Sequence, residues 1–349
     1  DSFFRHLTGV KMIAAAEFTE PDFSAPPSDG ADFSEIKGQE RARRAMEIAA
    51  AGGHNILMVG PPGTGKSMLA KRLPTIMPRM SFEESVEVTK IHSASGTLDS
   101  ESGLVTVRPF RSPHHTMSAP ALVGGGAIPM PGEISLASGG VLFLDELPEF
   151  NKAVTESMRQ PLEDGQVTIT RAAGRVTYPS RFMLVCAMNP CRCGYYGSGI
   201  RECTCRREDI KKYLSKISGP LLDRIDIQVE LPALSFDELT REEKSESSAQ
   251  IRARVEDARS LAVRRMGSAS ACNAAMTRSE IREFCAVGDA SLRLLKTAFE
   301  KMNLSARGYD RVLRVARTVA DLAHSESIEP QHVAEAIQLR SLDKKYFGI

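Results

Sequence analysis

Residues 60–67 have the types and spacing of a phosphate-binding loop. They read Gly-Pro-Pro-Gly-Thr-Gly-Lys-Ser, after the apolar run 56–59 and before the helix-compatible stretch 68–73. Gly63 and Gly65 allow a tight turn whose N–H groups face phosphate oxygens. Lys66 is expected to reach the outer phosphates and Ser67 to ligate Mg²⁺, which a chance glycine-rich turn would not do. The expected nucleotide contacts are Gly60, Pro61, Pro62, Gly63, Thr64, Gly65, Lys66, Ser67 and Met68.

A second apolar run, 141–144, ends in the two acids Asp145 and Glu146. On a buried parallel strand, this end faces the edge of the sheet where ligands bind. Asp145 is expected to hold Mg²⁺ through water, and Glu146 to orient or deprotonate an attacking water molecule. The alternative is a strand that ends in two solvated acids, which is common. The nearby phosphate-binding loop favours the catalytic interpretation.

Three further side chains are candidates for contact with phosphate or with the attacking water. Asn189 ends the next predicted strand, between the acids and the loop, and suits positioning of the water. Arg224 precedes the following strand and is expected to reach the γ-phosphate of a neighbouring subunit, as an arginine finger. An ion pair with Asp223 or Asp226 is the alternative for Arg224. Arg307 lies at the first turn of a predicted helix, where it opposes the helix dipole, so a phosphate partner is expected for it and, as a second choice, for Arg311.

Four cysteines form two Cys-x-Cys pairs that are nine residues apart: Cys191, Cys193, Cys203 and Cys205. With three glycines between them, they are able to surround a tetrahedral Zn²⁺. Four thiolates leave no open position, so such a metal would be structural. The spacing differs from the commoner Cys-x₂-Cys, and a redox pair or inert thiols remain alternatives.

The order of predicted elements indicates an α/β domain followed by a helical domain. Strands alternate with helices over 33–232, which predicts a parallel sheet flanked by helices. A helix is predicted over 39–51, another begins at the capping box of Ser81, and Pro74 and Pro78 predict a break between helices. The region also contains a Gly-, Pro- and His-rich insert at about 95–132 and a hairpin over 166–182 that turns at Ala173-Gly174. Residues 233–349 are predicted to form a helical lid, and 1–32 a linker or the tail of an upstream domain.

The composition is that of a globular protein with almost no net charge. The 349 residues include 45 Lys and Arg and 44 Asp and Glu, so total charge does not indicate a nucleic-acid partner. No apolar run approaches the roughly 18 residues of a membrane span, and the start is not signal-like. The seven cysteines are therefore expected to be reduced thiols or metal ligands in a cytoplasmic protein that does not contact a membrane.

The motifs, in this order, resemble those of the AAA+ ATPases over residues 33–349. Residues 60–67 match Walker A, 141–146 Walker B, Asn189 the sensor, Arg224 the finger and Arg307 the lid sensor. The insert at 95–132 and the hairpin at 166–182 are similar to those of the helix-2-insert group, which contains the MCM helicases and the magnesium chelatases.

More narrowly, four strings resemble the ComM/YifB family of magnesium-chelatase-like proteins: 38–40, 108–115, 132–137 and 305–311. The second contains Arg-Ser-Pro-His-His, which generic AAA+ proteins lack. The resemblance implies ATP and Mg²⁺ as cofactors, with Ile36 near the adenine, and a hexameric ring. It also implies a Lon-like domain before the motor and, for ComM members, branch migration of DNA during natural transformation.

Local charge supports a DNA partner. Residues 171–216 contain ten Lys and Arg against three acids, and Arg171 and Arg175 lie at the strand ends of the predicted hairpin. In a ring such a hairpin would face the pore and contact phosphates without reading sequence. A solvated charged surface is the alternative. His114 and His115 are expected either to line the pore and contact DNA or to be hydrogen-bonded loop residues.

The leading functional prediction is a hexameric ATP-driven motor, a helicase acting on single-stranded or branched DNA. The alternative is a protein-remodelling or chelatase-type motor. A nucleotide switch without turnover is disfavoured, because Lys66, Asp145, Glu146, Asn189 and Arg224 form a complete set for hydrolysis.

Overall fold

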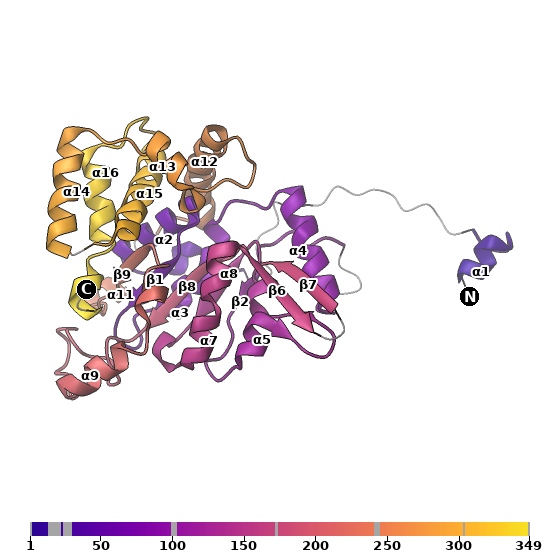
Figure 1. Cartoon of the computed structure of the whole chain (residues 1–349), viewed down its shortest axis with the longest axis horizontal. Helices are drawn as coiled ribbons and strands as arrows, with labels where there is room; N and C mark the ends of the chain where they lie inside the picture. Colours follow the sequence, from indigo (N-terminus) through magenta and orange to yellow (C-terminus); the bar gives the residue numbers. More distant parts are fainter. Residues whose placement is uncertain are drawn as a thin grey trace.

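A computed structural model describes residues 2–12, 22–23, 30–98, 103–171, 174–240, 245–302 and 304–347. A sheet flanked by helices forms the centre, and the helices of the C-terminal third group together beside it (Figure 1). The predicted fold class, an α/β domain of AAA+ type with a helical lid, is confirmed.

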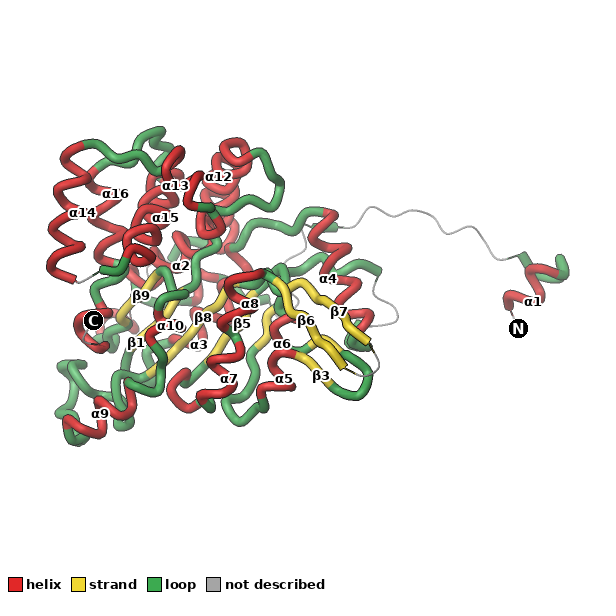
Figure 2. Tube along the Cα trace, viewed as in Figure 1, coloured by secondary structure: helices red, strands yellow, loops and turns green. Residues whose placement is uncertain are grey.

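The central sheet has five parallel strands in the order β2-β5-β8-β1-β9 (Figure 2). They are β1 (Ile56–Val59), β2 (Phe110–Arg111), β5 (Val141–Leu144), β8 (Met183–Met188) and β9 (Ile227–Glu230). The strands β1, β5 and β8 are buried along their whole length, as expected when helices cover both faces of a parallel sheet. The sequence predicts these strands and β9 to within two residues, whereas β2 lies inside the predicted insert and is not predicted.

The helices of the α/β part begin and end largely where the sequence predicts. They are α2 (Glu40–Gly52), α3 (Lys66–Ile76), α4 (Phe82–Ala94), α5 (Ala119–Val123), α6 (Glu133–Leu136), α7 (Lys152–Ser157), α8 (Arg159–Asp164), α9 (Arg207–Leu214) and α10 (Gly219–Leu222). The capping box predicted at Ser81 is present at the start of α4. The predicted break at Pro74 is wrong: α3 continues through Pro74 to Ile76, because buried Leu69, Leu73 and Ile76 hold it against the sheet.

Two antiparallel hairpins lie beside the sheet. The first, inside the predicted insert, consists of β3 (Gly124–Gly125) and β4 (Met130–Pro131). The second consists of β6 (Gln166–Arg171) and β7 (Gly174–Pro179), where a hairpin is predicted. Of its predicted turn, residues 172–173 lie outside the described residues. Figure 2 shows β6 and β7 close to β3.

The C-terminal part is helical. It contains α11 (Phe236–Thr240), α12 (Ser248–Met266), α13 (Arg278–Phe284), α14 (Asp289–Met302), α15 (Ala306–Leu322) and α16 (Pro330–Gln338), and ends in a π-helical turn, Asp343–Phe347. A short α1 (Ser2–Leu7) precedes all of these elements. One hydrophobic core runs from the sheet into the lid, so the boundary near residue 232 stays a prediction.

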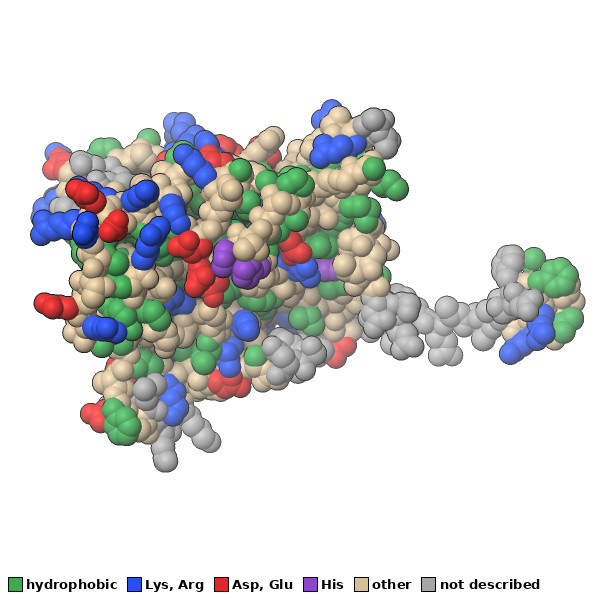
Figure 3. Space-filling model, turned by 90° about the horizontal axis from the view of Figure 1, so that it is seen from below, with side chains coloured by type: hydrophobic (Ala, Val, Ile, Leu, Met, Phe, Trp, Pro, Cys, Tyr) green, Lys and Arg blue, Asp and Glu red, His purple; other side chains and the backbone are tan. Residues whose placement is uncertain are grey.

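The surface carries charges of both signs. On the face drawn in Figure 3, Lys and Arg side chains alternate with Asp and Glu, as the near-neutral net charge leads one to expect. Within the described residues, no helix is both long and apolar enough to cross a membrane.

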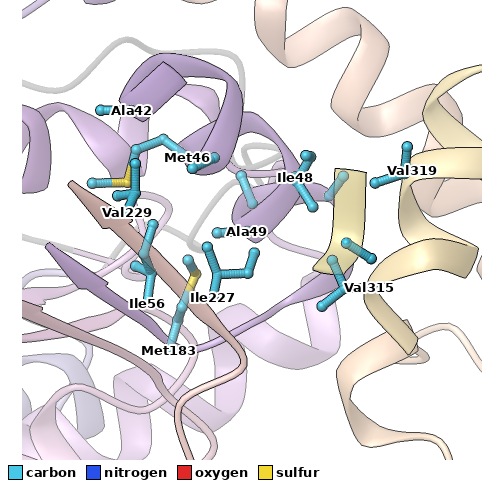
Figure 4. Close-up of a cluster of buried hydrophobic side chains, with 14 of the residues drawn as sticks. Ala42, Met46, Ile48, Ala49, Ile56, Met183, Ile227, Val229, Val315 and Val319 are labelled. Atoms are coloured by element: carbon cyan, nitrogen blue, oxygen red, sulfur yellow. The ribbon is translucent and has the colours of Figure 1, made fainter. Parts of the chain in front are cut away.

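Alternate residues of the central strands point to opposite faces and fill two hydrophobic clusters. On one face, strand residues such as Ile56 and Ile227 pack on α2, and Figure 4 shows Val315 and Val319 of α15 in the same cluster. On the other face, Leu57, Leu142 and Leu184 belong to a cluster that also contains the following residues of α5, β6 and α9: Leu122, Val167, Ile169, Ile210 and Leu214. Because both faces are buried, the sheet is held in place. The candidate nucleotide-binding site lies at its carboxyl edge.

Candidate nucleotide-binding site

The phosphate-binding loop connects β1 directly to the first residue of α3, Lys66. Gly63 and Gly65 have φ of 77° and 87°, a left-handed conformation that side chains other than glycine rarely adopt. No side chain caps α3, so its first N–H groups are available to a ligand. This end of a helix also carries a partial positive charge, which suits phosphate.

Lys66 lies under the loop and contacts the end of a neighbouring strand. Its Nζ donates to the carbonyl oxygens of Gly60 and Pro61, both at 2.7 Å, and to Asn189 Oδ1 at 3.1 Å. Burial lowers the pKa of Lys66 to about 8, although the charges of Asp145 and Glu146 act in the opposite direction. Lys66 and Asn189, two separately predicted site residues, are therefore in contact.

The two predicted Mg²⁺ ligands are also in contact. Ser67 Oγ donates to Asp145 Oδ2 at 2.6 Å, across from α3 to the end of β5. The second carboxylate oxygen, Asp145 Oδ1, accepts from the backbone N–H of Glu146 at 2.9 Å. A hydroxyl and a carboxylate at this separation are hard oxygen ligands that one Mg²⁺ can share, so the residues fit the ion.

Gln39 supports the loop from the other side. Its Nε2 donates to the carbonyl oxygens of Pro232 at 2.7 Å and Thr64 at 3.4 Å, so it links the phosphate-binding loop to the chain after β9. The sequence does not predict this role of Gln39, although Gly38-Gln39-Glu40 is one of the strings that resemble the ComM/YifB family. Met68 is partly exposed in the first turn of α3, whereas Ile36 is buried in the core, 3% exposed.

His115 lies next to the second acid. Its Nδ1 is 3.7 Å from Glu146 Oε2, and its neighbour His114 forms a hydrogen bond through Nδ1 to Thr116 Oγ1 at 2.8 Å. Among the described residues, His114 is thus a hydrogen-bonded loop residue, whereas the partner of His115 is the Glu146 carboxylate. Contact of His114 and His115 with DNA stays a prediction, and the structure adds that His115 lies beside Glu146.

The predicted finger, Arg224, is held against α8. Its side chain pairs with Glu163 and donates to the carbonyl oxygens of Pro220 and Arg159. Neither Asp223 nor Asp226 is its partner among the described residues. Arg307 is exposed at the first turn of α15 and forms no ion pair within the part of the chain that the structure describes.

Arg311, the second-choice lid cation, has a different place. It is 7% exposed and lies 3.5 Å from Asp226 and 3.6 Å from Asp223. Asp226 directly precedes β9, at the amino edge of the sheet, which is opposite the loop. The prediction that Arg311 contacts the nucleotide is corrected: one turn beyond Arg307, its side chain faces the sheet and balances a buried carboxylate.

The four predicted cysteine ligands come together directly after β8. Their sulfur atoms all lie within 4.8 Å of one another. Cys191 is buried two residues after Asn189, and the other three are partly buried. A Cβ placed on Gly194 would lie 2.5 Å from Pro62. This cysteine cluster (residues 191–205) therefore packs directly on the phosphate-binding loop. The set fits a tetrahedral Zn²⁺.

The hairpin β6–β7 presents its cations to solvent. Val167 and Ile169 of β6 are buried, whereas Arg171 and the first four residues of β7, Arg175 included, are exposed. Neither arginine forms an ion pair among the residues described here. Both charges are therefore available to an external partner.

Comparison with known proteins identifies the family. The family described as magnesium chelatase, subunit ChlI, matches residues 32–239, which is more than half of the chain. The corresponding ChlI C-terminal family matches residues 245–340. The chain belongs to the magnesium chelatase ChlI family.

Within the ChlI family, the chain is similar to YifB and ComM proteins, as predicted. It is 44% identical over 321 residues to the uncharacterized protein YifB of Salmonella typhimurium, covering 92% of this chain and 62% of YifB. It is 45% identical over 313 residues to the competence protein ComM of Haemophilus influenzae, covering 89% and 60%. The 38 kDa magnesium-chelatase subunit of Cereibacter sphaeroides is 26% identical over 174 residues, covering 45% and 52%. The chain thus spans about three fifths of YifB and ComM.

Proposed function

We propose that this chain is the ATP-hydrolysing motor of a protein that acts on DNA. The observation that carries the proposal is the hydrogen-bonded set at the carboxyl edge of the sheet, in which Lys66 contacts Asn189 and Ser67 contacts Asp145. The loop and Lys66 bind the phosphates, Ser67 and Asp145 hold Mg²⁺, Glu146 takes the proton of the attacking water and Asn189 orients it. Bound Mg²⁺ supplies charge to neutralise the phosphate oxygens.

The motor is proposed to work as a ring, hexameric as the family resemblance implies. Arg224 is tied to Glu163, Pro220 and Arg159, and none of its contacts among the described residues involves its own phosphate-binding loop. Such an arginine suits the γ-phosphate of a neighbouring subunit. The exposed Arg307 is a second cation for this role.

DNA is the proposed substrate, single-stranded or branched, and the activity is that of a helicase that promotes branch migration. The exposed Arg171 and Arg175 on the hairpin β6–β7 support phosphate contact, and the similar ComM protein of Haemophilus influenzae is a competence protein. A protein-remodelling or chelatase-type motor is the second candidate, favoured by the match to the magnesium-chelatase subunit of Cereibacter sphaeroides.

Replacing both hairpin arginines tests DNA contact. Arg171→Ala with Arg175→Ala should weaken binding of a single-stranded oligonucleotide and reduce the slope of log K against log salt by about 1.4, since each phosphate contact contributes about 0.7. The matched control is Arg282→Ala with Arg293→Ala, two exposed arginines of the lid. Equal effects of the two double variants on affinity and slope would exclude the hairpin as the contact.

We also propose that the cysteine cluster binds a structural Zn²⁺. It would hold residues 191–205 together behind Asn189 and against Pro62, at the border of the nucleotide site.

A further inference from the structure

Arg224, the proposed finger, lies in a short segment that joins α10 to β9. Residues 223–226 follow α10 directly, and β9 begins at Ile227. The Arg224 side chain leaves this segment towards α8, where Glu163 and the carbonyl oxygen of Arg159 bind it. The position of the backbone of residues 223–226 therefore determines from where the finger reaches out.

Two buried arginines of the lid contact this segment. Arg311 of α15 lies 3.6 Å from Asp223 and 3.5 Å from Asp226, the first and last residues of the segment. Arg340, which follows α16, donates to the carbonyl oxygen of Ile225 at 2.8 Å. The lid thus contacts three of the four residues from which the finger extends.

The amino edge of the sheet contacts the same segment. Asn55, directly before β1, donates through Nδ2 to the carbonyl oxygen of Arg224 at 2.8 Å and through its backbone N–H to Asp226 at 3.3 Å. Nδ1 of the buried His54 is 3.5 Å from the Asp226 carboxylate. Removal of Arg311 would therefore leave Asp226 with neighbouring groups of the sheet, while the segment would lose its contact with α15.

Arg311 connects the elements that carry two cations proposed for one phosphate. On α15 it lies one turn beyond the exposed Arg307, and its guanidinium lies beside the segment that carries Arg224. The helix α15 packs against the start of β9, since Val315 and Ile227 share one hydrophobic cluster (Figure 4). Both proposed cations would have to reach the same γ-phosphate of a neighbouring subunit, so the spacing of α15 and the segment is important.

The contacts of Arg311 depend on charge more than on directed hydrogen bonds. Its distances to Asp223 and Asp226 are longer than usual hydrogen bonds, and its buried Nη1 forms no hydrogen bond within the described residues. Buried ion pairs are screened by salt much less than exposed ones. The charge of Arg311 is therefore the property that a substitution has to test.

We propose that Arg311 is a positioning residue that holds residues 223–226 against the lid and so places the finger Arg224 for the active site of a neighbouring subunit. Arg311 acts through Arg224 and does not itself contact the nucleotide. A displaced finger stabilises the transition state less, because a misplacement of about 1 Å can cost about 100-fold in rate. The inference rests on the proposed role of Arg224 and does not depend on DNA.

Two substitutions at one position test the charge. Arg311→Met keeps much of the side-chain volume and removes the charge, whereas Arg311→Lys keeps the charge. We expect Arg311→Met to lower kcat for ATP hydrolysis by about 10- to 100-fold with KM changed by less than about twofold, and Arg311→Lys to retain most of the parent kcat. The matched control is Arg265→Met, which removes one of the two lid arginines that pair with the buried Asp321 and should retain the parent kcat.

Mixtures of inactive chains show which site Arg311 serves. In a mixed ring, Lys66→Ala subunits still provide intact fingers, and Arg224→Ala subunits still provide intact nucleotide sites. Arg311→Met should therefore regain activity when it is mixed with Lys66→Ala and stay inactive when it is mixed with Arg224→Ala. The opposite pattern, or an unchanged kcat in Arg311→Met, would overturn the inference.

The same experiment separates the inference from the proposed function. If Arg224→Ala hydrolyses ATP like the parent chain, Arg224 is not a finger, and both fail. If Arg224→Ala regains activity with Lys66→Ala but Arg311→Met does not, the finger stands and the inference alone fails.

Thermal unfolding of each variant shows whether a lowered rate reflects loss of folded chain. In that case Asp223→Asn decides, because it weakens the same ion pair at a side chain that is 39% exposed. A lowered kcat that Lys66→Ala restores and Arg224→Ala does not would support the inference. A parent-like kcat in Asp223→Asn would overturn it.

Discussion

Among the proposed phosphate-binding residues, Lys66 is the one whose pKa the fold changes most clearly. Its pKa is lowered to about 8 by burial, and phosphate oxygens would favour the charged form again. Lys66 is almost fully charged below about pH 7 and loses its charge as the pH rises through its pKa of about 8. Affinity for ATP should therefore be constant below about pH 7 and fall by up to about tenfold per pH unit above pH 8.

A fluorescent ATP analogue titrated between neutral and alkaline pH measures this dependence. Lys66→Arg is the matched control, because an arginine keeps its charge throughout the range. Its affinity should not decline with pH, whatever its absolute value. Parallel pH profiles for the parent and Lys66→Arg would show that Lys66 does not cause the decline.

Glu146 and Glu149 are two nearby acids with different predicted roles. Glu146→Gln should retain ATP binding and lower hydrolysis by about 10²- to 10⁴-fold, since it removes the proposed base. Glu149, which pairs with Lys216 at 3.1 Å, serves as the control, and Glu149→Gln should hydrolyse ATP almost normally. Single-turnover kinetics measures both rates. Normal hydrolysis by Glu146→Gln would remove that residue from the mechanism.

At the scale of elements, the cysteine cluster connects the proposed zinc site to the phosphate-binding loop. Gly194 packs on Pro62, Cys191 follows Asn189 by two residues, and Tyr196 contacts Tyr346 near the C-terminal end of the described chain. Loss of the metal should therefore loosen the phosphate-binding loop, the chain after β8 and the C-terminal turn that contains Tyr346.

Cys203→Ser is expected to abolish binding of one Zn²⁺ per chain and to lower Tm by several degrees, since each kcal/mol changes Tm by about 2–4 °C in domains of this size. Cys272 lies outside the cysteine cluster and is partly buried, so the Cys272→Ser variant should still bind the metal. Metal analysis and thermal unfolding provide the readouts. Parent chain that binds no Zn²⁺, or an unchanged Tm in Cys203→Ser, would contradict this prediction.

The elements that could be predicted from the sequence are those whose signals are local. Apolar runs predict β1, β5, β8 and β9 because each is buried on both faces, and the capping box at Ser81 predicts the start of α4. The strands β2, β3 and β4 contain two residues each and have no pattern that periodicity could reveal. Such short strands form only because they pair with another strand in the folded chain.

Side-chain partners were harder to predict than elements. The groups at the ends of β1, β5 and β8 were predicted as one site, because parallel strands end at the same edge of a sheet. The ion pair of Arg311 with Asp226 and the contact of His115 with Glu146 were not predicted, for the opposite reason. The side of α15 that faces the sheet, and the register of a two-residue strand, depend on tertiary packing that the sequence alone does not display.

At the scale of the whole molecule, the central question is whether subunits complete one another's sites. Arg224→Ala should leave ATP binding intact and reduce turnover by about 10³-fold or more, as expected of an arginine finger. A chain with Lys66→Ala still has Arg224 but does not bind phosphate well. Mixing these two inactive variants should restore part of the activity if Arg224 acts across an interface. Mixtures as inactive as their components would contradict the proposed finger.

The charge distribution limits the expected interaction with DNA. The molecule is nearly neutral and shows both signs on the face drawn in Figure 3, so long-range attraction is expected to be small. Contact is expected instead at defined cations such as Arg171 and Arg175. Such contacts to phosphates are expected to bind DNA without sequence preference.

The most direct test of the account is the rate of ATP hydrolysis by the chain with and without single-stranded and forked DNA, with Glu146→Gln as the blank. The account predicts that DNA stimulates hydrolysis and that Arg171→Ala with Arg175→Ala loses the stimulation while retaining the DNA-free rate. Hydrolysis above the blank that is indifferent to both DNA forms would contradict a DNA motor and favour a protein partner.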